Sequence, residues 1–142
     1  MRLFNWTKQN AAYIPEIDAE HRTLYRLGDE LHKAALAGAG PEQVQAMMEE
    51  LIAGAEDHFS HEERLMRAAQ YPASAFDWHK QQHDGVRRRV QQFVASYKQG
   101  DTEAPLLCVE YLSHWLKGHT TLTDRMMGAY LRNHGRRQAV AS

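Results

Sequence analysis

The chain has 142 residues, a length that predicts a single domain with a sizeable hydrophobic core. Its 17 Lys and Arg residues nearly balance its 18 Asp and Glu residues, so the composition indicates neither a nucleic-acid-binding surface nor a site for anionic membranes. A single cysteine excludes an intramolecular disulfide and a thiolate-rich metal cluster. Nine histidines are the compositional outlier.

The distribution of apolar residues along the chain indicates where in the cell the protein is expected. The N-terminus lacks the continuous apolar run of a signal peptide, and no segment approaches the length of a transmembrane helix. We therefore expect a cytoplasmic protein that does not associate with membranes. Cys108 follows Leu106 and Leu107, and we expect it to be a small buried core residue.

Four amphipathic helices are predicted, because apolar residues recur at three- and four-residue steps without the period-two alternation of strands. An N-terminal arm precedes them, since Pro15 is unfavourable to helix and Asp18 is a good N-cap. Short connections make successive helices antiparallel, which predicts an all-α, up-down-up-down four-helix bundle. The expected segments of this single domain, residues 1–142, are an arm at 1–17 and helices at about 18–37, 41–69, 75–98 and 102–133.

The fourth predicted helix carries an apolar stripe that is expected to face the core. A straight α-helix places residues three and four apart on one face. The stripe consists of Cys108, Leu112, Trp115, His119, Leu122 and Met126.

Seven potential metal ligands lie on or beside the core-facing stripes. Polar side chains are costly there unless they are paired or bind metal. In an antiparallel bundle, the starts of the first and third helices share one end with the ends of the second and fourth. At about 1.5 Å per residue, the seven lie mostly within roughly 5–20 Å of that end. They are His21, His58, Glu62, His79, His83, His119 and Asp124.

The spacing of the candidate ligands within each helix places two pairs on a common face but does not explain a third pair. His58 with Glu62, and His79 with His83, are four residues apart and therefore share a helix face. His119 and Asp124 are five apart, which separates them by roughly 140° on an ideal α-helix. Either Asp124 reaches in from the flank, or the helix carries a local π-bulge. The sequence leaves both possibilities open.

The types of donor atom limit which metals are expected to bind. Imidazole and carboxylate without thiolate argue against a finger-type zinc site, and suit iron as well as zinc, copper and nickel. Seven ligands exceed the needs of one ion, and carboxylates can bridge two. If both carboxylates and one solvent-derived oxygen bridge, roughly eleven of the twelve positions on two octahedral ions are filled. One position then remains for an external ligand.

The ordered set of motifs resembles the hemerythrin family, specifically its single-domain bacterial members, over nearly the whole chain. Each motif is weak alone, but all seven ligand positions of the family carry the expected residue types. The motifs are Trp6 in the arm, Ile17-Asp18-x-x-His21-x-x-Leu24, His58-Phe59-x-x-Glu62-Glu63-x-x-Met66, Tyr71-Pro72, His79-x-x-x-His83 and Trp115-Leu116-x-x-His119-x-x-x-x-Asp124.

This resemblance implies a non-haem centre of two iron ions, joined by an oxo or hydroxo bridge, that binds O2 reversibly. O2 is expected at the iron held by His21 and His58, in a pocket with Leu116 as its lid and Trp115 beside it. The implied ligand sets are His79, His83 and His119 for one iron and His21 and His58 for the other, with Glu62 and Asp124 bridging the two.

Two positions depart from the family pattern. Thr120 follows the fourth-helix histidine, where the family usually has an aliphatic residue, and Met127 with its neighbours replaces an often aromatic position. Either departure can alter pocket polarity or autoxidation without removing a ligand. Outside the ligand set, His61 and His114 are expected to be exposed, and Glu63 is expected either at the surface or behind a ligand.

The predicted function is O2 binding for storage, delivery or sensing, which is the role of a binding protein rather than an enzyme. The alternative is a di-iron enzyme of the same fold that handles peroxide or nitric oxide. Substrate-oxidising di-iron enzymes resemble the chain less, because their sites are rich in carboxylates. A sensor would need a separate protein partner, and the sequence leaves the oligomeric state open.

Overall fold

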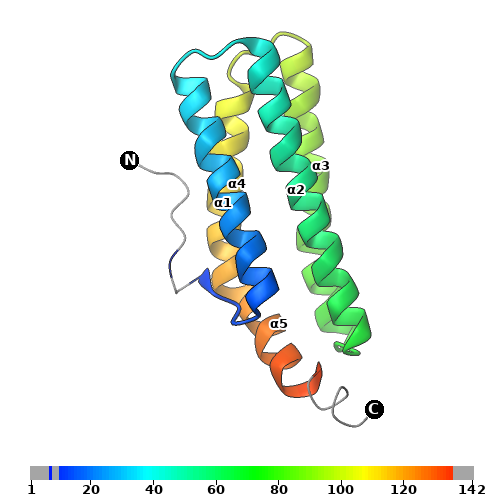
Figure 1. The fold of residues 1–142 in the computed structure, drawn as a ribbon. Helices are drawn as coiled ribbons and strands as arrows, with labels where there is room; N and C mark the ends of the chain where they lie inside the picture. Colours follow the sequence, from blue (N-terminus) through cyan, green and yellow to red (C-terminus); the bar gives the residue numbers. More distant parts are fainter. Residues whose placement is uncertain (1–6, 8–9, 136–142) are drawn as a thin grey trace.

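The computed structural model describes Thr7 and residues 10–135, so Trp6 lies outside the described residues. Within this part of the chain there is no β-strand, and four helical rods run up and down to form a bundle (Figure 1), which confirms the predicted fold class. The rods are α1 (Pro15–Leu36), α2 (Pro41–Ala68), α3 (Ala73–Lys98) and a fourth rod made of α4 (Ala104–Gly118), η2 (His119–Thr123), α5 (Asp124–Tyr130) and η3 (Leu131–Gly135).

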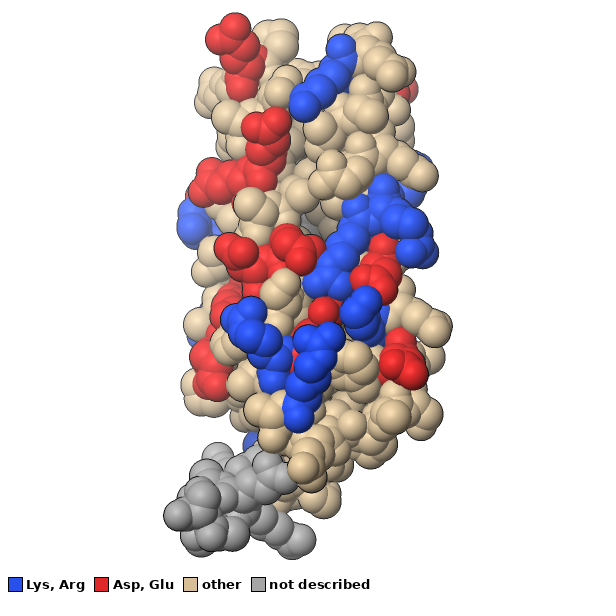
Figure 2. All heavy atoms as spheres, turned by 90° about the vertical axis from the view of Figure 1, so that its right-hand side faces the viewer, with Lys and Arg blue, Asp and Glu red and all other residues tan. Residues whose placement is uncertain are grey.

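Packing contacts place the rods at the corners of a square. Both α1 and α3 pack against α2 and against α4, which leaves α2 and α4 on a diagonal. Cys108 is buried in the core and unpaired, as predicted. Among the described residues, no helix is long and apolar enough to cross a membrane. On the face formed by α2 and α3, basic and acidic side chains are interspersed (Figure 2).

The first helix begins earlier than predicted. Pro15 occupies its first turn, where the missing N–H costs nothing and the fixed φ suits a helix. The prediction that Asp18 caps this helix is wrong, because Ile14 is the N-cap residue. The Asp18 carboxylate instead accepts hydrogen bonds from the backbone N–H groups of Ala12 at 2.7 Å and Tyr13 at 3.1 Å. Asp18 therefore fastens the arm to the bundle.

The fourth rod departs from a straight α-helix between His119 and Thr123, where it forms one π-helical turn. A π turn holds an extra residue, so the sequence beyond it is rotated by one position relative to an α-helix. Two members of the predicted stripe are consequently wrong: Leu122 is 57% exposed and Met126 is 50% exposed. Their neighbours Thr123 and Met127 are buried in their place.

The described part of the arm packs closely on the last helical segment. Asn10, Ala11 and Ala12 are buried, and the side chain of Arg132 donates a hydrogen bond to the Ala12 carbonyl. A Cβ atom placed on Gly128 would lie 2.1 Å from that same carbonyl oxygen. Glycine at this position therefore allows the arm to reach the bundle.

This close approach predicts opposite effects for two glycine-to-alanine substitutions. A Cβ atom placed on Gly85, in α3, would have no neighbour within 4 Å, so Gly85→Ala should stabilise the protein by about 0.5–1 kcal/mol. Gly128→Ala should destabilise it by about 1–3 kcal/mol, because the arm must move away. Urea unfolding of the metal-free protein measures both. Stabilisation by Gly128→Ala would show that the arm does not pack there.

Candidate metal centre

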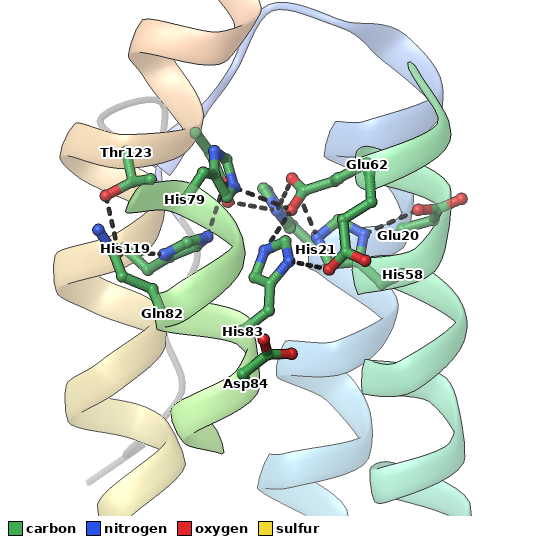
Figure 3. A network of polar contacts seen from close by, with 12 residues as sticks. Glu20, His21, His58, Glu62, His79, Gln82, His83, Asp84, His119 and Thr123 are labelled. Atoms are coloured by element: carbon green, nitrogen blue, oxygen red, sulfur yellow. Dashed lines mark hydrogen bonds and ion pairs between the residues drawn. The ribbon is translucent and has the colours of Figure 1, made fainter. Parts of the chain in front are cut away.

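A buried polar layer interrupts the core at one level of the bundle. On each rod it lies between residues of a large apolar cluster, which includes Leu24 and Leu116, and residues of a smaller one, which includes Ile17 and Met127. All seven predicted ligands are in this layer and are at most 4% exposed, and they are His21, His58, Glu62, His79, His83, His119 and Asp124. The structure therefore brings together side chains from all four rods (Figure 3).

The seven side chains form two groups that share both carboxylates. Within each group, one nitrogen or oxygen from every member lies within 4.8 Å of those of the others. The first group contains three histidines and the second contains two. The groups are Glu62, His79, His83, His119 and Asp124, and His21, His58, Glu62 and Asp124.

Glu62 turns one oxygen toward each group. Its Oε1 lies 3.0 Å from Nε2 of His83 and 3.5 Å from Nε2 of His79. Its Oε2 lies 3.4 Å from Nε2 of His58 and 3.7 Å from Nε2 of His21. The carboxylate thus lies between two sets of imidazole nitrogens, in the orientation that a bridging ligand requires.

The two carboxylate oxygens of Asp124 are also directed to different groups. Its Oδ1 lies 2.8 Å from Nε2 of His119 and 3.1 Å from Nε2 of His79, and its Oδ2 lies 3.0 Å from Nε2 of His21. The π turn makes this possible, because its i→i+5 repeat stacks Asp124 over His119. The Asp124 N–H donates to the His119 carbonyl. Of the two geometries left open by the sequence, the structure therefore has the π-bulge.

The hydrogen bonding of these atoms tests whether the site fits a metal. In the described part of the chain, every buried side-chain nitrogen or oxygen without a hydrogen-bond partner belongs to this cluster. Several nitrogen–oxygen distances are short, yet these contacts lack hydrogen-bond geometry. Buried polar atoms are otherwise satisfied in proteins. Neutral nitrogen and anionic oxygen donors that converge in this way fit metal ions.

Three of the histidines are oriented by hydrogen bonds at the ring nitrogen facing away from the cluster (Figure 3). The Nδ1 atom of His83 lies 2.8 Å from Glu63, and that of His119 lies 2.7 Å from Oε1 of Gln82. Thr123 also donates to Gln82, at 2.9 Å. Such partners fix the tautomer, so that Nε2 presents a lone pair to the cluster.

Glu20 performs this role for His58 and also engages a second histidine. Its two carboxylate oxygens lie 2.7 Å from Nδ1 of His58 and 2.7 Å from Nδ1 of His61. The prediction that His61 is exposed is therefore wrong, since its side chain is 26% exposed and hydrogen-bonded. His114 is exposed as predicted. Sequence reasoning missed Glu20 and Gln82, because contacts between helices have no characteristic spacing in the sequence.

Arg87 supports Glu63 from outside the layer. Its guanidinium donates to Glu63 at 2.9 Å, to Asp84 at 2.8 Å and to Glu56 at 2.7 Å. Against the effect of burial, the hydrogen bonds from His83 and Arg87 lower the pKa of Glu63. Glu63 is thus a buried carboxylate behind His83, a predicted ligand, and this is one of the two positions expected for it.

Aromatic and aliphatic side chains cover the layer on the side of the large cluster. Phe59 stacks on His83 with ring centroids 4.2 Å apart, and Trp115 stacks on His119 at the same separation. Leu116 is buried in the large cluster, with Trp115 packed against that cluster. These residues restrict the access of water to the layer.

Without metal, attraction between the imidazoles and the carboxylates stabilises the layer. Burial opposes ionisation of His58, yet the charge of Glu62 and the hydrogen bond to Glu20 raise its pKa to about 10. Contacts with Asp124 and Glu62 raise the pKa of His79 to about 9. Against the effect of burial, the surrounding imidazoles hold the pKa values of Glu62 and Asp124 below their ordinary range. Burial lowers the pKa of His119.

Comparison with known proteins places the chain in a family. A family model described as the hemerythrin HHE cation binding domain matches residues 13–131. A bacteriohemerythrin of Aquifex aeolicus (strain VF5) is 31% identical over 110 residues, covering 76% of this chain and 82% of the relative. A bacteriohemerythrin of Ralstonia nicotianae is 29% identical over 135 residues, covering 95% and 93%.

A solved structure of a leucine-to-phenylalanine mutant shares the fold, with a TM-score of 0.84 at 23% identity, covering 92% of this chain and 98% of that one. The fold and the buried histidine–carboxylate layer define a metal-binding four-helix bundle. With the family match, they show that the chain belongs to the hemerythrin family.

The pKa shifts predict how the stability of the metal-free protein depends on pH. Raised pKa values at His58 and His79 contribute stability that is present below about pH 6.5 and lost as the pH rises through 9 to 10. The depressed pKa values of Glu62 and Asp124 contribute stability that is lost in acid. The lowered pKa of His119 acts in the opposite direction to the raised pKa values of His58 and His79. Urea unfolding should therefore show lower stability at about pH 9.5 than at about pH 6.

The control for this prediction is a histidine outside the layer. His58→Asn should flatten the decline in stability between about pH 6 and 9.5, whereas His114→Asn, at an exposed position, should leave it unchanged. An unchanged decline in His58→Asn would contradict the assignment.

Proposed function

We propose that the chain is a cytoplasmic O2-binding protein with a centre of two iron ions, and not an enzyme. The observation that carries this proposal is the division of both carboxylates, since Glu62 and Asp124 each direct one oxygen to each group of histidines. Bound as ferrous ions, the pair supplies the two electrons that reversible O2 binding requires. Membership of the hemerythrin family supports the choice of iron.

In this proposal the two positions have different numbers of protein ligands. One iron would be held by His79, His83 and His119, and the other by His21 and His58. Glu62 and Asp124 contribute to both. The position held by His21 and His58 has one nitrogen fewer, and is therefore where the protein leaves room for an external ligand.

The surrounding residues orient the ligands and exclude water. Glu20, Glu63 and Gln82 accept hydrogen bonds from ligand histidines and so fix their rings. We assign Leu116 as the lid of the O2 pocket, with Trp115 beside it. A pocket that excludes water would favour release of O2 as the intact molecule over release of reduced oxygen species. Storage, delivery and sensing all require this reversibility.

Metal reconstitution tests the proposal. The protein, loaded with ferrous iron without air, should bind about two ions per chain. Air should produce a visible charge-transfer band that disappears when O2 is removed and returns on re-exposure. Irreversible bleaching accompanied by turnover of peroxide or nitric oxide would instead show that the protein is an enzyme.

Glu62→Ala tests the bridging role. Loss of the shared carboxylate should reduce iron content from about two ions to one or fewer per chain and abolish the reversible O2 band. Glu50→Ala, an exposed substitution on the same helix, should retain both. Full iron content and O2 binding in Glu62→Ala would exclude Glu62 as a bridging ligand.

A further inference from the structure

Two buried hydroxyl groups lie beside the metal layer. Tyr25 on α1 is 7% exposed and Thr120 in η2 is fully buried, and their oxygens are 3.4 Å apart. Tyr25 follows His21 by one helical turn and shares its face, while Thr120 directly follows His119. The pair therefore lies beside the layer, with Tyr25 next to His21 of the two-histidine group and Thr120 next to His119 of the three-histidine group.

The hydrogen bonds of Thr120 identify the donor in this pair. Its hydroxyl donates to the Leu116 carbonyl at 2.7 Å and accepts from Nδ2 of Asn10 at 3.1 Å. The orientation of the Asn10 amide is defined, because its Oδ1 accepts from the backbone N–H of Thr7. A threonine hydroxyl has a single proton. Since Leu116 takes that proton, Tyr25 must be the donor to Thr120.

The bond from Tyr25 to Thr120 is long. A typical O–H···O bond measures about 2.5–3.0 Å, so 3.4 Å is a weak contact that a better acceptor can displace. Side chains on α-helices lean toward the N-terminus, which directs Tyr25 back over the turn that contains His21. Burial and the nearby charge of Asp124 raise the pKa of Tyr25, although the contact with Thr120 opposes this, so the hydroxyl keeps its proton.

We propose that Tyr25 is a specificity-determining hydrogen-bond donor to a small anionic ligand bound beside His21, and that such a ligand replaces Thr120 as the acceptor of the Tyr25 proton. This inference rests on the proposed function, because the ligand binds to the metal pair. A charged acceptor forms a stronger bond with the hydroxyl than a neutral one does. The pocket therefore favours ligands that carry negative charge over neutral ligands of similar size.

Azide binding to the iron-loaded, oxidised protein tests this role without measuring O2 binding. Loss of a hydrogen bond to a charged ligand weakens binding by about tenfold to a hundredfold, which is the increase in azide Kd expected for Tyr25→Phe. The matched control is Tyr97→Phe, because the Tyr97 hydroxyl bonds to the Pro41 carbonyl, far along the bundle. Its azide Kd should stay within about twofold of wild type.

A second substitution tests whether Thr120 is only the acceptor of the Tyr25 proton when no ligand is bound. Thr120→Val removes the acceptor that competes with azide for the Tyr25 proton, so azide affinity should hold or increase. A loss as large as that of Tyr25→Phe would make Thr120 the donor and overturn the assignment. Thermal unfolding of each metal-free variant verifies that it folds.

The outcomes distinguish this inference from the proposed function. If wild type binds two irons and azide, and Tyr25→Phe binds azide as tightly, only the role of Tyr25 is refuted. If wild type fails to bind iron, the di-iron proposal is refuted and the role of Tyr25 with it.

Discussion

Two fully buried carboxylates, Glu62 and Asp124, impose the constraint on which this structure depends. An isolated carboxylate in a protein interior costs several kcal/mol, so a fold that buries two must surround them with compensating groups. Here five imidazoles from four rods provide that compensation. The bundle must therefore bring positions from distant parts of the sequence to one level, with apolar clusters above and below.

The π turn connects this constraint to the rest of the fourth rod. By adding one residue to a single turn, it places Asp124 against His119 and also turns Thr123 inward, where its hydroxyl bonds to Gln82. The same rotation buries Met127 against the end of the core and exposes Leu122. One local irregularity thus provides a shared carboxylate, supports a histidine and closes the apolar cluster beyond them. Functional sites are where such turns are often found.

The sequence predicted the four helices and the convergence of the seven polar residues, because periodicity, i,i+4 spacing and depth in the bundle are properties of single helices. Predictions from the sequence were wrong where the position of a residue depends on contacts with other segments. The α-period alone placed Leu122 and Met126 in the core, since the energetic demand for Asp124 at the centre has no representation in a hydrophobic pattern. Asp18 was predicted as a cap because its actual partners, in the arm, are visible only in the folded chain.

The same limit applied to the residues that hydrogen-bond to the histidines of the layer from behind. Glu20 precedes His21 and so points about 100° away from it, toward α2 rather than into the layer. Only the packing of α1 on α2 shows that this direction leads to His58 and His61. Single-helix patterns do not encode such pairs.

The supporting groups also differ in charge between the two groups of histidines. On the three-histidine side, Arg87 partly neutralises Glu63, and His119 is supported by the neutral amide of Gln82. On the two-histidine side, Glu20 supports His58 without a comparable guanidinium contact among the described residues. The second partner of Glu20 is thus a histidine, whereas the second partner of Glu63 is a guanidinium. An anionic partner increases the donor strength of an imidazole.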